Sequence, residues 1–162
     1  MVKINLKESA WLALPVTVAV YVVSWLFGIL GIGTTPLFSA VPSTSVVTGT
    51  VGTKVLSFIG GILPFSLNFG TIITVYLSAV VGLIIGSFLI GQFNLPAFKN
   101  FLGFNGNSGK IASTLMWGAL PVYLILVGFK IPPIMSIVGI LVHTVAVSLV
   151  AVWLANLVKL KI

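Results

Sequence analysis

The chain has 162 residues, of which 59% are hydrophobic and only 6% are charged, whereas charged residues make up about 25% of an average soluble domain. Glu8 is the single acidic residue, and the chain has one histidine and no cysteine. This composition excludes a soluble fold and leaves no residues for a catalytic metal, a pair of catalytic acids or a catalytic triad. We therefore expect an all-α, polytopic transmembrane helix bundle that is not an enzyme, with residues 1–162 forming one integral membrane domain.

The basic residues indicate what surrounds the chain. They are eight lysines that give a formal net charge of +7, and they lie singly at the ends of apolar runs. Nucleic-acid binding needs clustered basic residues interleaved with aromatic ones, and the sequence has no such cluster. Lysines in these positions are typical of anchors at the lipid headgroups. The expected partner is therefore the lipid bilayer, with bound lipids, and not nucleic acid.

Four apolar runs reach the roughly 20 residues that a helix needs to cross a bilayer: residues 10–31, 69–90, 111–129 and 134–158. Lys3 and Lys7 precede the first run, as basic residues precede the apolar core of a signal peptide. The run is longer than the roughly 7–15 residues of such a core, and no small-residue cleavage site follows it. We interpret it as an uncleaved first span.

Residues 34–64 are of a different kind, because they are rich in Ser, Thr, Gly and Pro and end in a short apolar run. This run is a half-helix, a re-entrant or interfacial element, or the end of a fifth span that begins near Ser45. With four spans, six lysines lie on the side of the termini and only Lys54 and Lys130 lie on the other. The asymmetry favours four spans with both termini in the cytoplasm. We expect the plasma membrane of a prokaryote.

The second span carries a line of small residues, Ser78, Gly82 and Gly86, spaced four apart. Small side chains allow two helix backbones to approach closely, and this spacing is chiefly an association motif in membranes. The line therefore predicts a contact with a neighbouring helix. A groove for a lipid or a substrate is the alternative.

The connection 92–110 has two parts. A glycine-rich turn, from Gly103 to Lys110, lacks the full spacing of a phosphate-binding loop. The residues before it place four apolar side chains on one helical face, which predicts a short helix lying in the membrane interface: Leu95, Phe98, Phe101 and Leu102. Predicted interface anchors are Trp11, Trp153, Lys99 and Lys110.

Pro121 lies inside the third span and is predicted to kink it. The connection that follows, residues 130–133, is very short, so the third and fourth spans should form a tight antiparallel hairpin.

The fourth span has a second line of mostly small residues, which predicts another helix contact: Gly139, His143, Val147, Ala151 and Ala155. His143 is the only histidine, and an ionisable residue inside a membrane marks a candidate functional site. One interpretation is an axial haem ligand. The other, which we favour, is a neutral histidine that hydrogen-bonds a Ser, a Thr or a carbonyl across a helix contact. No cofactor is otherwise expected.

These features lead to two hypotheses. The first is a non-catalytic structural or assembly subunit, which packs against other membrane subunits or against itself within a larger complex. The second is a small channel or carrier in which residues 45–64 form a re-entrant element lining a cavity. The sequence has no charged ring, no internal repeat and no acidic coupling site to support transport.

A third hypothesis comes from a resemblance. The stretch from Gly106 to Gly109, followed by Ala112-Ser113-Thr114 and then Gly118-Ala119-Leu120-Pro121, resembles the middle of the Yip-domain family of small polytopic membrane proteins. The resemblance covers about residues 100–160. It implies a role in organising membranes or membrane traffic, and it implies five spans where we count four.

Overall fold

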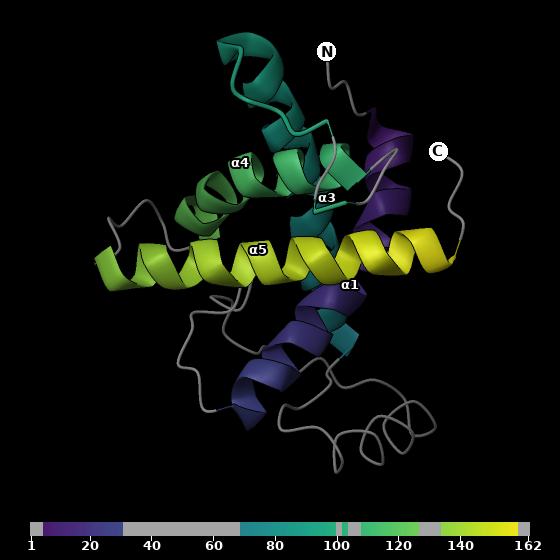
Figure 1. Cartoon of the computed structure of the whole chain (residues 1–162), viewed down its shortest axis with the longest axis vertical. Helices are drawn as coiled ribbons and strands as arrows, with labels where there is room; N and C mark the ends of the chain where they lie inside the picture. Colours follow the sequence, from purple (N-terminus) through teal and green to yellow (C-terminus); the bar gives the residue numbers. More distant parts are fainter. Residues whose placement is uncertain (1–4, 31–68, 100–101, 104–107, 127–133, 159–162) are drawn as a thin grey trace.

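The computed structural model describes residues 5–30, 69–99, 102–103, 108–126 and 134–158. Within these ranges every regular element is an α-helix, as the composition predicts, and Figure 1 shows their arrangement. The helices are α1 (Leu6–Ile29), α3 (Phe69–Phe93), α4 (Ser108–Leu126) and α5 (Ile134–Leu157). The predicted interfacial, re-entrant or fifth-span element at 34–64 lies outside the described residues.

Three of these four helices are long and apolar enough to cross a membrane: Leu6–Phe27, Phe69–Phe93 and Ile137–Leu157. The helix α4 has 19 residues and is more polar, because it begins with Ser108-Gly109-Lys110 and carries Ser113 and Thr114. Three helices thus have the length and composition of membrane spans, but α4, the third predicted span, does not meet the same test.

The start of α1 differs from the prediction, since the helix begins at Leu6 and not at residue 10. The reason is a capping box formed by Asn5 and Glu8. The Glu8 amide donates a hydrogen bond to Asn5 Oδ1 at 2.8 Å, and the Asn5 amide donates to Glu8 Oε2 at 3.4 Å. The only acidic side chain of the chain therefore accepts a hydrogen bond from a backbone amide at the N-terminus of this helix.

The prediction of a short interfacial helix after the second span is wrong for residues 95–99, which the structure describes and which are not helical. Asn94 ends α3 with a φ of 47°, in the left-handed region where a helix commonly terminates. Gly103 has a φ of 84°, which agrees with the predicted glycine turn.

Residues 96–98 lie against one face of α4 instead of forming a helix of their own. The Phe98 amide donates to Ser113 Oγ at 2.6 Å, and Trp117 Nε1 donates to the Pro96 carbonyl at 3.0 Å. A Cβ atom on Gly109 would collide with the carbonyl oxygen of Phe98. The periodic apolar side chains of this segment gave no sign that α4 would supply its hydrogen-bond partners.

In Figure 1, α1 and α3 run along the long axis in opposite directions, while α4 and α5 run across them, also in opposite directions. The packed pairs are α3 with α4, α1 with α5, α1 with α3 and α4 with α5. The antiparallel course of α4 and α5 matches the predicted hairpin. The core lies where the pairs cross, and its largest buried side chains include Leu12, Leu83, Ile111, Leu115, Ile140 and His143.

Candidate functional site

The line of small residues on α3 lies against α4. Gly82 and Gly86 are buried. A Cβ atom on Gly86 would fall on the backbone carbonyl of Thr114, and one on Gly118 would fall on the backbone carbonyl of Gly82. The backbones of α3 and α4 are therefore in direct contact, and there is no room for a side chain at Gly86 or at Gly118. We call these four residues, Gly82, Gly86, Thr114 and Gly118, the glycine seam.

The seam does not extend to the C-terminal end of α3. Ser78, one turn before Gly82, is buried with 8% of its side chain exposed. Gly91, near the end of α3, has open space where its Cβ would be. Gly91 follows Gly86 by five residues, so it already departs from the four-residue spacing of the predicted line.

His143 lies at the contact between α5 and α1 and is fully buried. Its Nε2 is 3.2 Å from Ser24 Oγ, at hydrogen-bond distance. The edge of the Phe27 ring packs against the imidazole, with 5.8 Å between ring centroids and 79° between the planes. We call Ser24, Phe27 and His143 the histidine contact.

The other predicted members of the α5 line lie at different depths. Val147 and Ala151 are fully buried, whereas Gly139 and Ala155 are half-buried. Thr144 and Ser148 are also buried, but their hydroxyls donate to the carbonyls of Ile140 and Thr144, one turn back on the same helix. These hydroxyls are therefore satisfied without reaching α1, whereas His143 reaches Ser24 across the contact.

The geometry of His143 bears on the haem hypothesis. The Nε2 atom that would bind iron lies within hydrogen-bond distance of Ser24, so the two roles compete for the same nitrogen. No group of three or more His, Cys, Asp or Glu side chains that could hold a metal occurs among the residues that the structure describes. The arrangement that is present ties two helices together.

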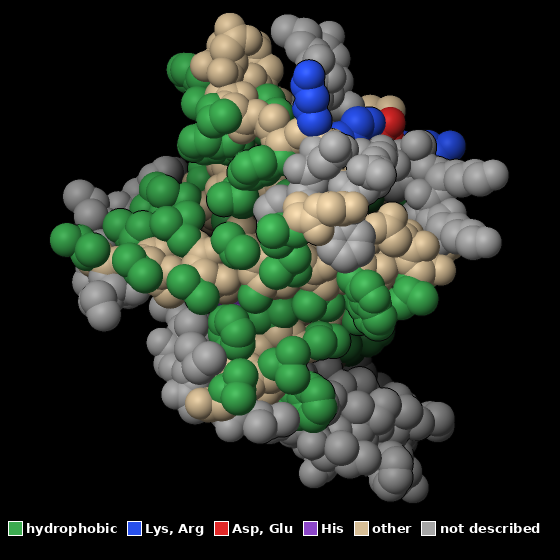
Figure 2. Space-filling view, in the orientation of Figure 1, with side chains coloured by type: hydrophobic (Ala, Val, Ile, Leu, Met, Phe, Trp, Pro, Cys, Tyr) green, Lys and Arg blue, Asp and Glu red, His purple; other side chains and the backbone are tan. Residues whose placement is uncertain are grey.

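The predicted anchors lie at the surface or close to it. Trp11 and Trp153 are about half exposed, at 51% and 53%, Lys99 is exposed, and Lys110 is half-buried. Figure 2 shows lysine side chains in blue and an acidic side chain in red near the start of α1, while hydrophobic side chains cover much of the remaining visible surface. The acidic side chain is Glu8, because the chain has no other.

Pro121 lies within α4, which continues through it from Ser108 to Leu126. The predicted kink stays a prediction. Gly118, three residues earlier, contacts Gly82 across the glycine seam. The small-residue step before Pro121 therefore serves close packing with α3.

Sequence reasoning found His143 and the α3 glycines but missed what they contact. Ser24 lies in an apolar helix with no pattern that links it to residue 143. Thr114 and Gly118 are spaced four apart on α4, as small residues at a helix contact often are, and this spacing could have identified the second half of the glycine seam.

Comparisons of the chain with known protein families, with curated proteins and with solved structures give no match. They neither support nor oppose the resemblance to the Yip-domain family. The helix contacts and the exposed helix faces are therefore the features from which a function can be inferred.

Proposed function

We propose that this chain is a non-catalytic integral membrane subunit that serves a structural or assembly role in a larger membrane complex. The observation that supports it is that the small residues and the buried histidine pack inside the chain, while the outer helix faces are mostly apolar. The glycine seam and the histidine contact both join helices within the chain. What remains on the outside of the described helices is mostly apolar. A partner would meet these apolar outer faces.

The outer face of α5 is the best candidate for such a contact. Its exposed residues recur at helical spacing along one side: Ile134, Val138, Leu141, Val142, Val145 and Trp153. The face opposite packs on α1 and α4. In a bilayer this outer side meets either lipid or another helix, and van der Waals packing is what holds helices together there.

Our proposal includes four spans, with α4 in the bilayer beside α3 and both termini on one side. The support is that α4 packs on α3 through the glycine seam and that Trp11 and Val158, near the two ends of the chain, line one groove. The steep crossing of α5 over α1 in Figure 1 means that both cannot stand along the membrane normal. If the membrane normal points toward the cluster of charged side chains in Figure 2, its direction lies between the axes of α1 and α5, and both helices are tilted.

The absence of cysteine allows a direct test, because each introduced cysteine is the only one in the chain. Val142→Cys places a thiol on the outer face of α5, where the native side chain is 47% exposed. Val147→Cys is the matched control on the buried face, where the native side chain is fully buried. We expect a thiol-reactive photo-crosslinker in native membranes to join Val142→Cys, but not Val147→Cys, to one discrete protein species.

A chain that stays monomeric in mild detergent, and whose Val142→Cys form crosslinks to nothing but lipid in membranes, would contradict the proposal. If the crosslinked species has twice the mass of the chain, the complex is a homo-oligomer. If it has another mass, the complex contains a different subunit.

The alternatives remain open as proposals. The channel or carrier depends on residues 45–64, which lie outside the described part of the chain. The Yip-like role depends on the resemblance alone. For the haem hypothesis, an absorbance spectrum of the protein purified from its native membrane is the test. We expect no Soret band, and a band that is lost in His143→Ala would contradict this expectation.

A further inference from the structure

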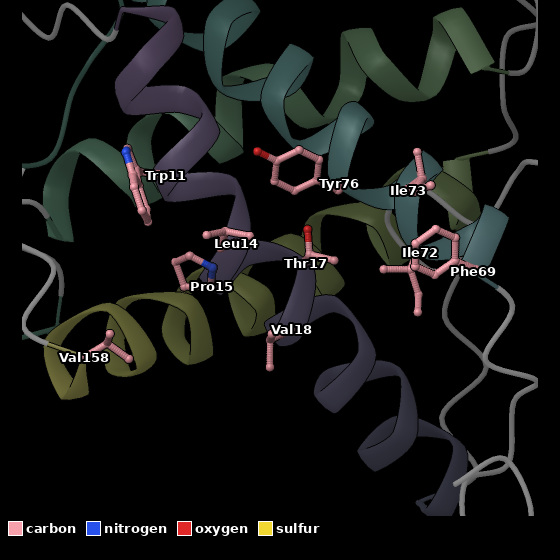
Figure 3. Close-up of a pocket in the computed structure, with 10 residues that line it drawn as sticks. All are labelled: Trp11, Leu14, Pro15, Thr17, Val18, Phe69, Ile72, Ile73, Tyr76 and Val158. Carbon is pink, nitrogen blue, oxygen red and sulfur yellow. The ribbon is translucent and has the colours of Figure 1, made fainter. Parts of the chain in front are cut away.

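A groove with a volume of about 550 Å³ lies between α1 and α3 and reaches the end of α5 (Figure 3). The volume is within the roughly 300–1,000 Å³ of sites that hold small molecules. One wall is formed by residues of α1 between Trp11 and Val18, and the facing wall by residues of α3 between Phe69 and Tyr76. Val158, just after α5, closes one end.

The two hydroxyls in these walls are already paired. The Thr17 hydroxyl donates to the Ala13 carbonyl at 2.7 Å, and the Tyr76 hydroxyl donates to the Ala10 carbonyl at 3.1 Å. In Figure 3 the Tyr76 hydroxyl points away from Ile73 and Phe69, toward α1. Both bonds stay inside the protein, so the groove presents hydrocarbon to whatever occupies it.

The ends of the groove differ in character. Figure 3 shows Trp11 and Val158 at one end and Phe69 and Ile72 at the other. Lys7 lies one helical turn before Trp11, so the two residues share a face of α1, and Lys7 is exposed. A positive charge beside a tryptophan is typical of the depth at which lipid headgroups lie. An occupant with an anionic head at the Lys7 end and a hydrocarbon tail along the groove matches this polarity.

The length of the groove also matches such an occupant. The helix from Lys7 to Val18 spans roughly 16 Å at 1.5 Å per residue, which is about half of the roughly 30 Å hydrocarbon core of a bilayer. Because α1 is tilted from the membrane normal, this stretch covers somewhat less than the depth of one leaflet, so headgroups level with Lys7 bring their acyl chains past Val18 and Phe69. We propose that the groove between α1 and α3 holds one acyl chain of an anionic phospholipid, whose phosphate lies beside the Lys7 ammonium.

The test is native mass spectrometry of the purified, delipidated chain titrated with dioleoyl phosphatidylglycerol or dioleoyl phosphatidylcholine. We expect one tightly retained phosphatidylglycerol and a preference over phosphatidylcholine of about fivefold, the size that one basic residue near an anionic lipid provides. Lys7→Gln should keep lipid binding but lose most of the preference. Lys99→Gln removes another exposed lysine, which lies beyond the end of α3 and not one turn from a groove residue, and it should keep the preference.

Two variants fill the groove from opposite walls. Val18→Trp and Ile73→Trp, at positions 51% and 44% exposed, should each lower retention of phosphatidylglycerol about tenfold. Val81→Trp is the matched control, because Val81 is also 44% exposed on α3 but does not line the groove. Circular dichroism and gel-filtration profiles identify variants that have lost their fold. If one groove variant is lost in this way, the variant on the opposite wall still tests the proposal.

Three outcomes would overturn the proposal. The first is equal retention of the two lipids by the unmodified chain. The second is an equal loss in Val81→Trp and in the groove variants, which would mean nonspecific surface lipid. The third is a dimer in the unmodified chain that Val18→Trp abolishes, which would assign the groove to a second copy. The first two outcomes have no bearing on crosslinking from the outer face of α5, and the third would place a contact between two copies at the groove and not on α5. The lipid site and the proposed subunit role can therefore fail separately.

Discussion

In the contact between α3 and α4 the two backbones touch, because Gly86 faces Thr114 and Gly118 faces Gly82. In the contact between α1 and α5 side chains meet, because Ser24 and Phe27 contact the ring of His143. Both contacts begin from a line of mostly small residues in the sequence. The difference shows that such a line leads to backbone contact where every facing residue is small, whereas the ring of His143 within the α5 line and the ring of Phe27 opposite it give a contact between side chains.

The two contacts should therefore fail in different ways. The glycine seam depends on shape, and a single added methyl group meets backbone that cannot move aside. The histidine contact depends on one hydrogen bond and one ring contact, and a membrane interior makes such bonds weaker contributors than their geometry suggests, since the unfolded helices also find partners. Steric damage to the seam is expected to exceed polar damage to the histidine contact.

The largest effect is expected from Gly86→Ala. The new Cβ overlaps the Thr114 carbonyl, so α3 and α4 must separate, and overpacking of this kind costs about 3 kcal/mol of unfolding free energy. Unfolding by titration with sodium dodecyl sulfate, followed by circular dichroism, measures it. Gly91→Ala is the control on the same helix, where the Cβ has open space, and it should be neutral or slightly stabilising. Equal losses in the two variants would show that the seam is not a close backbone contact.

An intermediate effect is expected from Ser113→Ala on the other side of α4. The change removes the hydroxyl that accepts the Phe98 amide at 2.6 Å, and the expected loss is about 1 kcal/mol of unfolding free energy. Ser148→Ala is the matched control, because it is also a buried serine but its hydroxyl bonds only within its own helix. Faster amide hydrogen exchange around residues 96–98 should accompany the loss in Ser113→Ala alone. Unchanged exchange there would contradict the proposed attachment of this segment to α4.

The smallest effect is expected at the histidine contact. A double-mutant cycle of Ser24→Ala and His143→Phe, with the phenyl ring preserving the packing against Phe27, should give a coupling free energy of about 0.6 kcal/mol and at most about 1.7 kcal/mol. The same detergent titration measures it. A cycle that pairs Thr17→Ala with His143→Phe is the control and should give no coupling, because the Thr17 hydroxyl bonds to its own helix. A coupling free energy larger than the loss of unfolding free energy in Gly86→Ala would show that the histidine contact stabilises the fold more than the glycine seam does.

Much of the secondary structure could be predicted from apolar run length alone. The second and fourth spans were expected to begin at residues 69 and 134, and α3 and α5 begin there. The first helix begins earlier than expected because Asn5 and Glu8 cap it, and their spacing is a sequence signal that the run of apolar residues concealed. The segment 94–99 could not be predicted, because its hydrogen bonds go to side chains of α4 and not along its own backbone.

The sequence by itself determined that the chain is suited to lipid and where most of its helices lie. A chain with one acidic residue and long apolar runs must bury its backbone polar groups in helices, because lipid offers no hydrogen bonds to them. It also showed which residues are small enough for close contact. Only the tertiary structure decided which helix each line of small residues meets, that Ser24 is the partner of His143, and that α1 and α3 leave a groove between them. The physical reason is that contacts between helices depend on crossing geometry and on matching levels along two axes, which the periodicity of a single helix does not contain.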